Sequence, residues 1–176
     1  IWSLPLRHRV PTAGYLFRQK EPALNVTKYA IERYELDMHQ IVAAKRGEDI
    51  ELASGEIIAN SLLTYRPYPP MSYAYCSDTN YSARLAKMCE GVDMLYHEAT
   101  YDASMQKMAK LRGHSSTADA AKVAKMAGAG KLLIGHFSSR YKELEPLLQE
   151  CREIFSETYI AEEKQTFTIL EKRNKE

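Results

Sequence analysis

The sequence predicts an α/β fold in which short strands alternate with helices. From Met71 onward, apolar runs at 73–76, 93–96 and 131–134 are separated by helical stretches, which is the pattern of βαβ units with parallel strands. The composition, 45% apolar and 27% charged residues, is that of an ordinary globular protein. A length of 176 residues suits one domain or a piece of a larger one.

Charge, cysteine content and hydropathy exclude several classes of protein. With 24 basic and 23 acidic residues, the chain has no overall charge that favours nucleic acid, so any attraction to RNA must come from local patches. Three cysteines without a CxxC pair favour reduced thiols in a cytoplasmic protein. No apolar run approaches the ~18 residues of a membrane span, so we expect no membrane partner.

The first 20 residues predict two strands joined by a loop that carries His8. A histidine between two arginines in a loop is, by itself, more often a solvated surface residue than a functional one. The chain starts at Ile1, without an initiator methionine, and reads at once as a strand. We therefore expect a fragment whose first half is missing.

Residues 21–65 lack the regular alternation of short strands and helices that begins at Met71, and this difference predicts an inserted arm. Residues 26–44 predict a helix with an imperfect apolar stripe, and 49–58 predict a hairpin with Gly55 at its turn. A proline cluster, Pro67, Pro69 and Pro70, marks the end of the arm.

The remaining elements follow from apolar periodicity and from helix start and stop signals. We expect strands at 73–76, 93–96, 131–134, 158–161 and 166–170, and helices at 81–89, 102–111, 118–127 and 143–155. Ser116 or Thr117 can cap the third of these helices. Residues 171–176 are charged and read as a frayed tail.

Polar residues follow three of the predicted parallel strands. Asp78, His97 and His136 each come just past a predicted strand end, and His114 starts the helix that leads into the third strand. Because parallel strands end at one edge of a sheet, we expect these four side chains to converge. Each has an ordinary alternative, such as a helix cap for Asp78 or a satisfied core histidine for His97. Four separate ordinary roles would all have to fall at the same edge of the sheet, so a shared functional site is the favoured interpretation.

Carboxylate and imidazole together suit zinc or another first-row metal ion. One aspartate and two or three histidines are too few ligands for a complete two-metal site. Further ligands would have to lie outside this chain, which agrees with the expected missing first half.

Four linked motifs resemble those of a known family. They are Ser77-Asp78-Thr79, His97-Glu98-Ala99-Thr100, His114-Ser115-Ser116-Thr117 and the run Gly135 to Tyr141, read GHFSSRY. In this order and spacing they resemble ribonuclease Z, the tRNA 3′-processing endonuclease of the metallo-β-lactamase fold. The loop Arg7 to Pro11, with Gly14 and Tyr15 after it, is similar to that family's histidine motif following its metal-binding cluster.

The resemblance implies roles for individual residues. His8 would bind one metal ion, Asp78 would bridge two, and His136 would bind the second. His114 would be the catalytic histidine at the departing oxygen. The motif of His97 and Glu98 would orient it, with Glu98 bonded to His114 as a carboxylate–imidazole pair.

Arg140 would meet the scissile phosphate, because a guanidinium suits phosphate oxygens. The implied cofactor is zinc, two ions per complete site. The implied fold is half of an αββα sandwich, with residues 1–176 as the C-terminal half of one metallo-β-lactamase-like domain. The implied partners are precursor tRNA and a second copy of the chain in a homodimer.

The sequence departs from the family pattern in three places. The His-x-His-x-Asp-His cluster is absent and by the resemblance would precede Ile1. Ser77 stands where the family has glycine, and the arm around 36–44 lacks a Gly-Pro motif.

The expected activity is metal-dependent removal of 3′ trailers from precursor tRNA by phosphodiester hydrolysis, which leaves a 3′ hydroxyl. The chain alone, with three ligands, is expected to be inactive and to expose one face of its sheet. Two alternatives stay open at this point: another hydrolase of the same fold, acting on small phosphodiesters or sulfate esters, and a half-domain that binds RNA or dimerises without catalysis.

Overall fold

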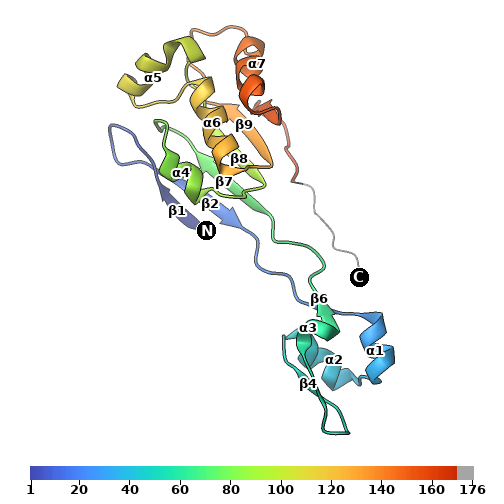
Figure 1. Ribbon diagram of the computed structural model, residues 1–176. Coiled ribbons are helices and arrows are strands. Elements are labelled where there is room, and N and C mark those ends of the chain that lie inside the picture. The colour runs from blue at the N-terminus through green and yellow to red at the C-terminus, as the bar shows by residue number, and fades with distance from the viewer. Residues whose placement is uncertain (170–176) are drawn as a thin grey trace. The chain divides into compact units, whose positions relative to one another are not determined.

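The computed structural model describes residues 1–169, which form two compact units (Figure 1). The first unit comprises residues 1–18 and 71–169, and the second comprises residues 19–70. All expectations for residues 170–176 lie outside the described part of the chain. Among residues 1–169, no helix is long and apolar enough to span a bilayer.

A six-stranded sheet forms the centre of the first unit. Its strands lie in the order β1 (Trp2–Pro5), β2 (Ala13–Arg18), β7 (Ser72–Cys76), β8 (Met94–Glu98), β9 (Lys131–Gly135) and β10 (Thr158–Ile160). Strands β1, β2 and β7 pair antiparallel, whereas β7, β8, β9 and β10 pair in parallel. The predicted βαβ pattern is confirmed, and the carboxyl ends of β7, β8 and β9 lie at one edge of the sheet.

Helices cover one face of this sheet and form the core with it (Figure 1). They are α4 (Ala83–Met88), α6 (Thr117–Ala127) and α7 (Glu145–Ile154), while a 3₁₀ turn (Ala103–Met105) and α5 (Gln106–Arg112) precede α6. Small residues of α6, such as Ala120, Ala121 and Ala124, are fully buried and allow the helix to approach the strands closely. Ser116 caps α6 in a capping box with Asp119, as one of the two predicted caps.

The opposite face of the sheet carries a row of aromatic side chains. Tyr15 pairs with Tyr75 and Phe17 with Tyr73, and the rings of Tyr75 and Tyr96 stack with centroids 4.7 Å apart. Tyr15, Phe17 and Tyr75 are 45%, 39% and 40% exposed. Residues 1–169 therefore leave an apolar face of the sheet in contact with solvent.

Strand β8 is longer than predicted. The sequence expectation ended this strand at Tyr96, but it continues through His97 and Glu98 because both residues pair with neighbouring strands. The prediction that His97 lies past the strand end is therefore wrong. Since side chains alternate along a strand, His97 and Glu98 point to opposite faces of the sheet.

A separate small core holds the second unit together. Its elements are β3 (Asn25–Val26), α1 (Lys28–Tyr34), α2 (Met38–Lys45), β4 (Ile50–Glu51), β5 (Ile57–Ile58), α3 (Asn60–Leu63) and β6 (Thr64–Tyr65). The predicted hairpin around Gly55 is confirmed as β4 and β5. The single helix predicted for 26–44 is wrong, because Glu35 adopts a left-handed conformation that ends α1 and Asp37 caps α2.

The predicted strand at 166–170 is also wrong for the described residues 166–169, which pair with no strand. Phe167 and Ile169 instead line a hollow with Tyr73, Met94 and Leu133 on the aromatic side of the sheet. Phe167 and Ile169 therefore cover a face of the sheet, instead of belonging to a further strand at its edge.

Candidate active site

Four of the predicted site residues lie together at the carboxyl edge of the parallel strands. His8 lies in the loop between β1 and β2, Asp78 two residues after β7, His114 between α5 and α6, and His136 directly after β9. Oδ1 of Asp78 is 3.4 Å from Nε2 of His136 and 4.0 Å from Nδ1 of His114. The ring centroid of His114 lies 5.1 Å from that of His8 and 5.3 Å from that of His136.

The backbone turns sharply at two of these residues. Asp78 has a φ of 56° and His136 a φ of 59°, both in the left-handed region that residues other than glycine seldom adopt. Such conformations cost on the order of 1–3 kcal/mol each and tend to cluster at functional sites.

Glu98 lies beneath the histidines and is fully buried. Its Oε1 accepts hydrogen bonds from the backbone N–H of Thr79 (2.5 Å) and from Nδ1 of His114 (3.0 Å). Its Oε2 accepts from the backbone N–H of Ser115 (3.1 Å) and the hydroxyl of Thr100 (2.5 Å). Four donors converging on two oxygens match an ionised carboxylate, which only accepts. The hydrogen bond predicted between Glu98 and His114 is thus present.

The same contacts fix the tautomers of His8 and His114. Nδ1 of His8 lies 2.8 Å from the carbonyl oxygen of Gly113, and Nδ1 of His114 faces the Glu98 carboxylate. Both partners only accept, so each Nδ1 carries the hydrogen and each Nε2 keeps a lone pair in the neutral ring. At Gly113, φ is +88° and a Cβ would lie 2.7 Å from Nδ1 of His8, so this contact requires glycine.

Thr100 fixes the third histidine in the same way. Its hydroxyl has one hydrogen, which it donates to Oε2 of Glu98 at 2.5 Å rather than to the more distant carbonyl oxygen of His136 at 2.9 Å. Nδ1 of His136, 3.0 Å from the same oxygen, must therefore donate to it. The Nε2 atoms of all three histidines are left for a proton or a metal ion, which is the usual arrangement of metal-binding histidines.

His97 does not take part in this cluster. It is fully buried in β8, its Nδ1 lies 2.8 Å from the carbonyl of Glu98, and its Nε2 has no partner among residues 1–169. Burial lowers the pKa of His97 below the usual value of 6.5, although Glu98 and Asp119 oppose the shift. His97 contributes to the candidate site through the strand that also carries Glu98.

Arg140 lies beside the cluster on an aromatic ring. Its guanidinium is 5.2 Å from the ring centroid of Tyr101, and Nε donates to the hydroxyl of Ser138 at 3.2 Å. The same Tyr101 ring meets His114 edge-on, with centroids 6.5 Å apart. Tyr101 therefore links the predicted phosphate-binding residue to the predicted catalytic histidine.

Hydrogen bonds between Tyr141 and Asp102 hold the loop that carries Arg140. The hydroxyl of Tyr141 donates to Oδ2 of Asp102 at 2.8 Å and accepts from the backbone N–H of Asp102 at 3.0 Å. Burial raises the pKa of Asp102, but hydrogen bonds from Ser104 and Tyr141 outweigh this effect, and the net shift is downward. The charged carboxylate is thereby favoured as an anchor for the loop.

The donor set fits a metal site. Ligand atoms of His8, Asp78 and His114 lie within 4.8 Å of one another, as do those of Glu98, His114 and His136. Imidazole nitrogens and a carboxylate are ligands that zinc accepts. His114 belongs to both groups, but its Nδ1 is held by Glu98, so only its Nε2 could bind. Asp78 lies between the histidines and could serve two ions.

Sequence reasoning missed the groups that hold these side chains in place. The backbone N–H groups of Thr79 and Ser115 and the carbonyl of Gly113 have no sequence signature as partners. Thr100 ends the motif His97-Glu98-Ala99-Thr100 and Tyr101 follows it directly. Their position beside this motif is the sequence feature that could have indicated a role in the site.

The sheet, its covering helices and the site at this edge agree with the predicted metallo-β-lactamase-like fold. The crystal structure of human tRNase Z, short form, aligns with 96% of this chain and 42% of its own, with a TM-score of 0.52 and 20% identity. At this identity the match concerns the fold, and it confirms the predicted fold class, half of a metallo-β-lactamase-like α/β domain.

Sequence comparison identifies the particular relatives. Ribonuclease Z of Porphyromonas gingivalis is 42% identical over 164 residues, which cover 93% of this chain and 54% of that protein. Ribonuclease Z of Phocaeicola vulgatus is 41% identical over 163 residues, 93% of this chain and 53% of that protein. No family model matches the sequence. The resemblance to ribonuclease Z is confirmed along nearly the whole chain, which spans about half the length of these relatives.

Proposed function

We propose that this chain supplies one wall of the active site of a metal-dependent endoribonuclease that removes 3′ trailers from precursor tRNA. The observation that carries the proposal is the convergence of three histidines and an aspartate over the buried Glu98. The names of the aligned relatives, ribonuclease Z and tRNase Z, support a nuclease that acts on tRNA.

His8, Asp78 and His136 would hold zinc, with Asp78 shared between two ions. Each histidine has its Nδ1 tied to the protein, so that Nε2 is free to bind. When bound, zinc supplies Lewis acidity that polarises the phosphate and lowers the pKa of water. These three side chains are too few for two four-coordinate ions, so the complete site needs further ligands.

His114 would donate a proton to the departing 3′ oxygen of the tRNA. Its Nδ1–H is held by Glu98, which orients the ring and stabilises the imidazolium form. In that form Nε2 carries the second proton, which passes to the oxygen as the P–O bond breaks. Arg140, held over Tyr101, would bind a non-bridging oxygen of the scissile phosphate.

Cleavage of precursor tRNA by the intact protein tests this proposal. His114→Ala should lower kcat by about 10²–10⁴-fold while zinc is retained, because only the proton donor is removed. His136→Ala should lose zinc together with activity. Full activity in either variant, or equal turnover of a model phosphodiester and precursor tRNA, would contradict the assignment.

Residues 19–70 would act as an arm that binds tRNA. The unit has its own core, including Ala30, Ala44 and Leu63, and is stabilised independently of the sheet. We further propose a cytoplasmic homodimer, in keeping with three free, buried cysteines and with the resemblance. Sedimentation equilibrium of the intact protein tests the dimer, and a monomer at micromolar concentration would refute it.

A further inference from the structure

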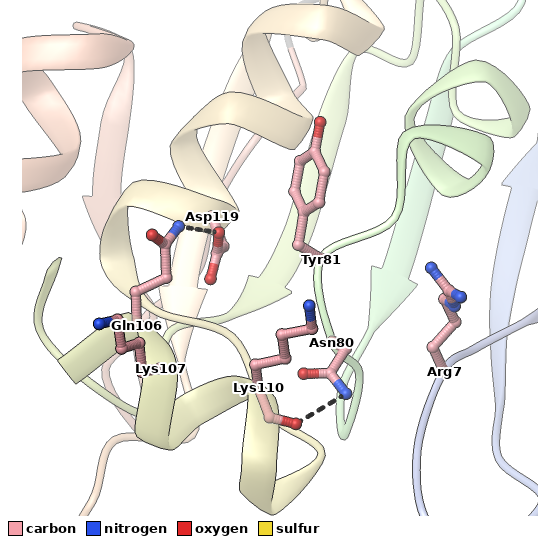
Figure 2. Close-up of a pocket in the computed structure, with 7 residues that line it drawn as sticks. All are labelled: Arg7, Asn80, Tyr81, Gln106, Lys107, Lys110 and Asp119. Carbon is pink, nitrogen blue, oxygen red and sulfur yellow. Dashed lines mark hydrogen bonds between the residues drawn. The ribbon is translucent and has the colours of Figure 1, made fainter.

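A pocket of about 500 Å³ lies beside the candidate active site and has no role in the chemistry described above (Figure 2). Arg7, Asn80 and Tyr81 line one side, and Lys107 and Lys110 of α5 line another. The volume is within the range of small-molecule and nucleotide sites.

The pocket and the histidine cluster are built from the same three segments. The loop after β1 supplies Arg7 to the pocket, next to His8. The loop after β7 supplies Asn80, two residues after Asp78. The end of α5 supplies Lys110, three residues before Gly113, whose carbonyl binds His8.

Hydrogen bonds that involve backbone groups hold these segments together. The N–H of Asn80 donates to the carbonyl of Arg7 at 2.7 Å, and Nδ2 of Asn80 donates to the carbonyl of Lys110 at 3.3 Å. The N–H of Arg7 donates to the hydroxyl of Thr79 at 3.1 Å. The pocket therefore lies at the same edge of the sheet as the histidine cluster. A linear ligand bound at the cluster can continue into the pocket.

The charge of the pocket is positive. Within residues 1–169, no carboxylate forms an ion pair with Arg7, Lys107 or Lys110. Asp119 is the acidic residue of the lining, and its oxygens are already bonded to Gln106 (2.6 Å) and to the N–H and hydroxyl of Ser116. The cations are thus free to meet an anionic ligand.

One further feature suits the backbone of a single-stranded RNA. Nδ2 of Asn80 binds the backbone of Lys110, which keeps this lysine at the pocket. Tyr81 also lines the pocket, but its ring extends away from Lys110 and Arg7 (Figure 2), and its hydroxyl donates to Sδ of Met126 at 3.2 Å. Cationic grooves that follow the sugar-phosphate backbone are typical of sites for single-stranded RNA.

We propose that this pocket binds a nucleotide next to the scissile phosphate, with Arg7 and Lys110 contacting its phosphate. The proposal rests on the proposed function in one respect, that the substrate is RNA. It adds a subsite that extends the binding of substrate beyond Arg140.

Equilibrium binding of a fluorescent single-stranded RNA decamer tests the subsite. The intact protein would carry His114→Ala, so that the RNA is not cut, and anisotropy would be measured between 50 and 200 mM salt. Arg7→Ala combined with Lys110→Ala should weaken binding at least tenfold at low salt. It should also reduce the slope of log K against log salt by about 0.7 for each phosphate that the variant no longer binds.

The matched control is Lys122→Ala combined with Lys125→Ala, which removes two exposed cations of α6 outside the pocket. The side chain of Arg7 can be removed without loss of its backbone bonds, so the loop should stay folded. An Arg7/Lys110 variant that binds RNA as the control does would overturn the subsite, even in a protein that cleaves precursor tRNA. Selective loss of binding in a protein that cleaves no precursor tRNA would support the subsite and overturn the proposed function.

Discussion

The substitution Glu98→Gln probes the centre of the candidate site with almost no change in shape. The carboxylate is fully buried and accepts from four donors, two on each oxygen. Glutamine keeps one accepting oxygen and replaces the other with an NH₂ group, which can only donate.

Either orientation of the new amide leaves a buried backbone N–H opposite another donor. With the NH₂ at the position of Oε2, the N–H of Ser115 loses its acceptor, and at the position of Oε1, the N–H of Thr79 does. An unsatisfied buried donor, together with the loss of bonds to a charged acceptor, should lower the free energy of unfolding by about 2–4 kcal/mol. The exposed Glu90 provides the matched control, since Glu90→Gln should change stability by less than about 0.5 kcal/mol.

Urea unfolding and precursor tRNA cleavage, measured on the same preparations of intact protein, give both readouts. In the proposed mechanism, Glu98→Gln also removes the negative charge that stabilises the imidazolium form of His114, so kcat should fall about 10²–10⁴-fold with a smaller change in KM. A Glu98→Gln protein as stable and as active as Glu90→Gln would refute the buried four-donor arrangement.

Three other predictions concern neighbouring features. Thr100→Val removes the acceptor for Nδ1–H of His136, so zinc affinity, measured by competition with a chelating dye, should fall about 10–100-fold. Because burial lowers the pKa of His97, the unfolded state binds its proton more readily, and stability should fall as pH decreases below about 6.5. His97→Gln should reduce this acid-side slope in urea unfolding between pH 7.5 and 5. Replacement of residues 19–70 by a two-residue turn should join β2 and β7, which pair antiparallel, as a hairpin that keeps the sheet. That variant should lose tRNA cleavage and keep hydrolysis of a small phosphodiester.

Each of these predictions has a contradicting result. Unchanged zinc affinity in Thr100→Val would mean that this hydroxyl does not orient the ring of His136. A wild-type and a His97→Gln protein with the same pH slope would remove His97 as the source of acid sensitivity. Unaltered cleavage of precursor tRNA without residues 19–70 would exclude this unit as an RNA-binding arm.

The convergence of Asp78 and His136 could be predicted from the sequence because both follow short apolar strands. Parallel pairing, itself predicted from the alternation of strands and helices, brings such strand ends to one edge. The roles of these residues came from the linked motifs rather than from periodicity.

The end of β8 could not be predicted from polarity. His97 and Glu98 look like the start of a loop, yet both are buried because β7 and β9 flank them and the surrounding hydroxyls and N–H groups satisfy Glu98. The break at Glu35 depends on a left-handed residue that carries no glycine signal. In both cases tertiary contacts, which a local pattern does not contain, decide the boundary.

Metal content measures most directly whether side chains of this chain form one wall of a metal site. We predict that the intact protein, purified and analysed by inductively coupled plasma mass spectrometry, holds two zinc ions. Asp78→Ala should remove most of both, whereas His39→Ala, a change at an exposed histidine of α2, should leave zinc unchanged. Zinc retained in full by Asp78→Ala would contradict a metal site at this edge of the sheet.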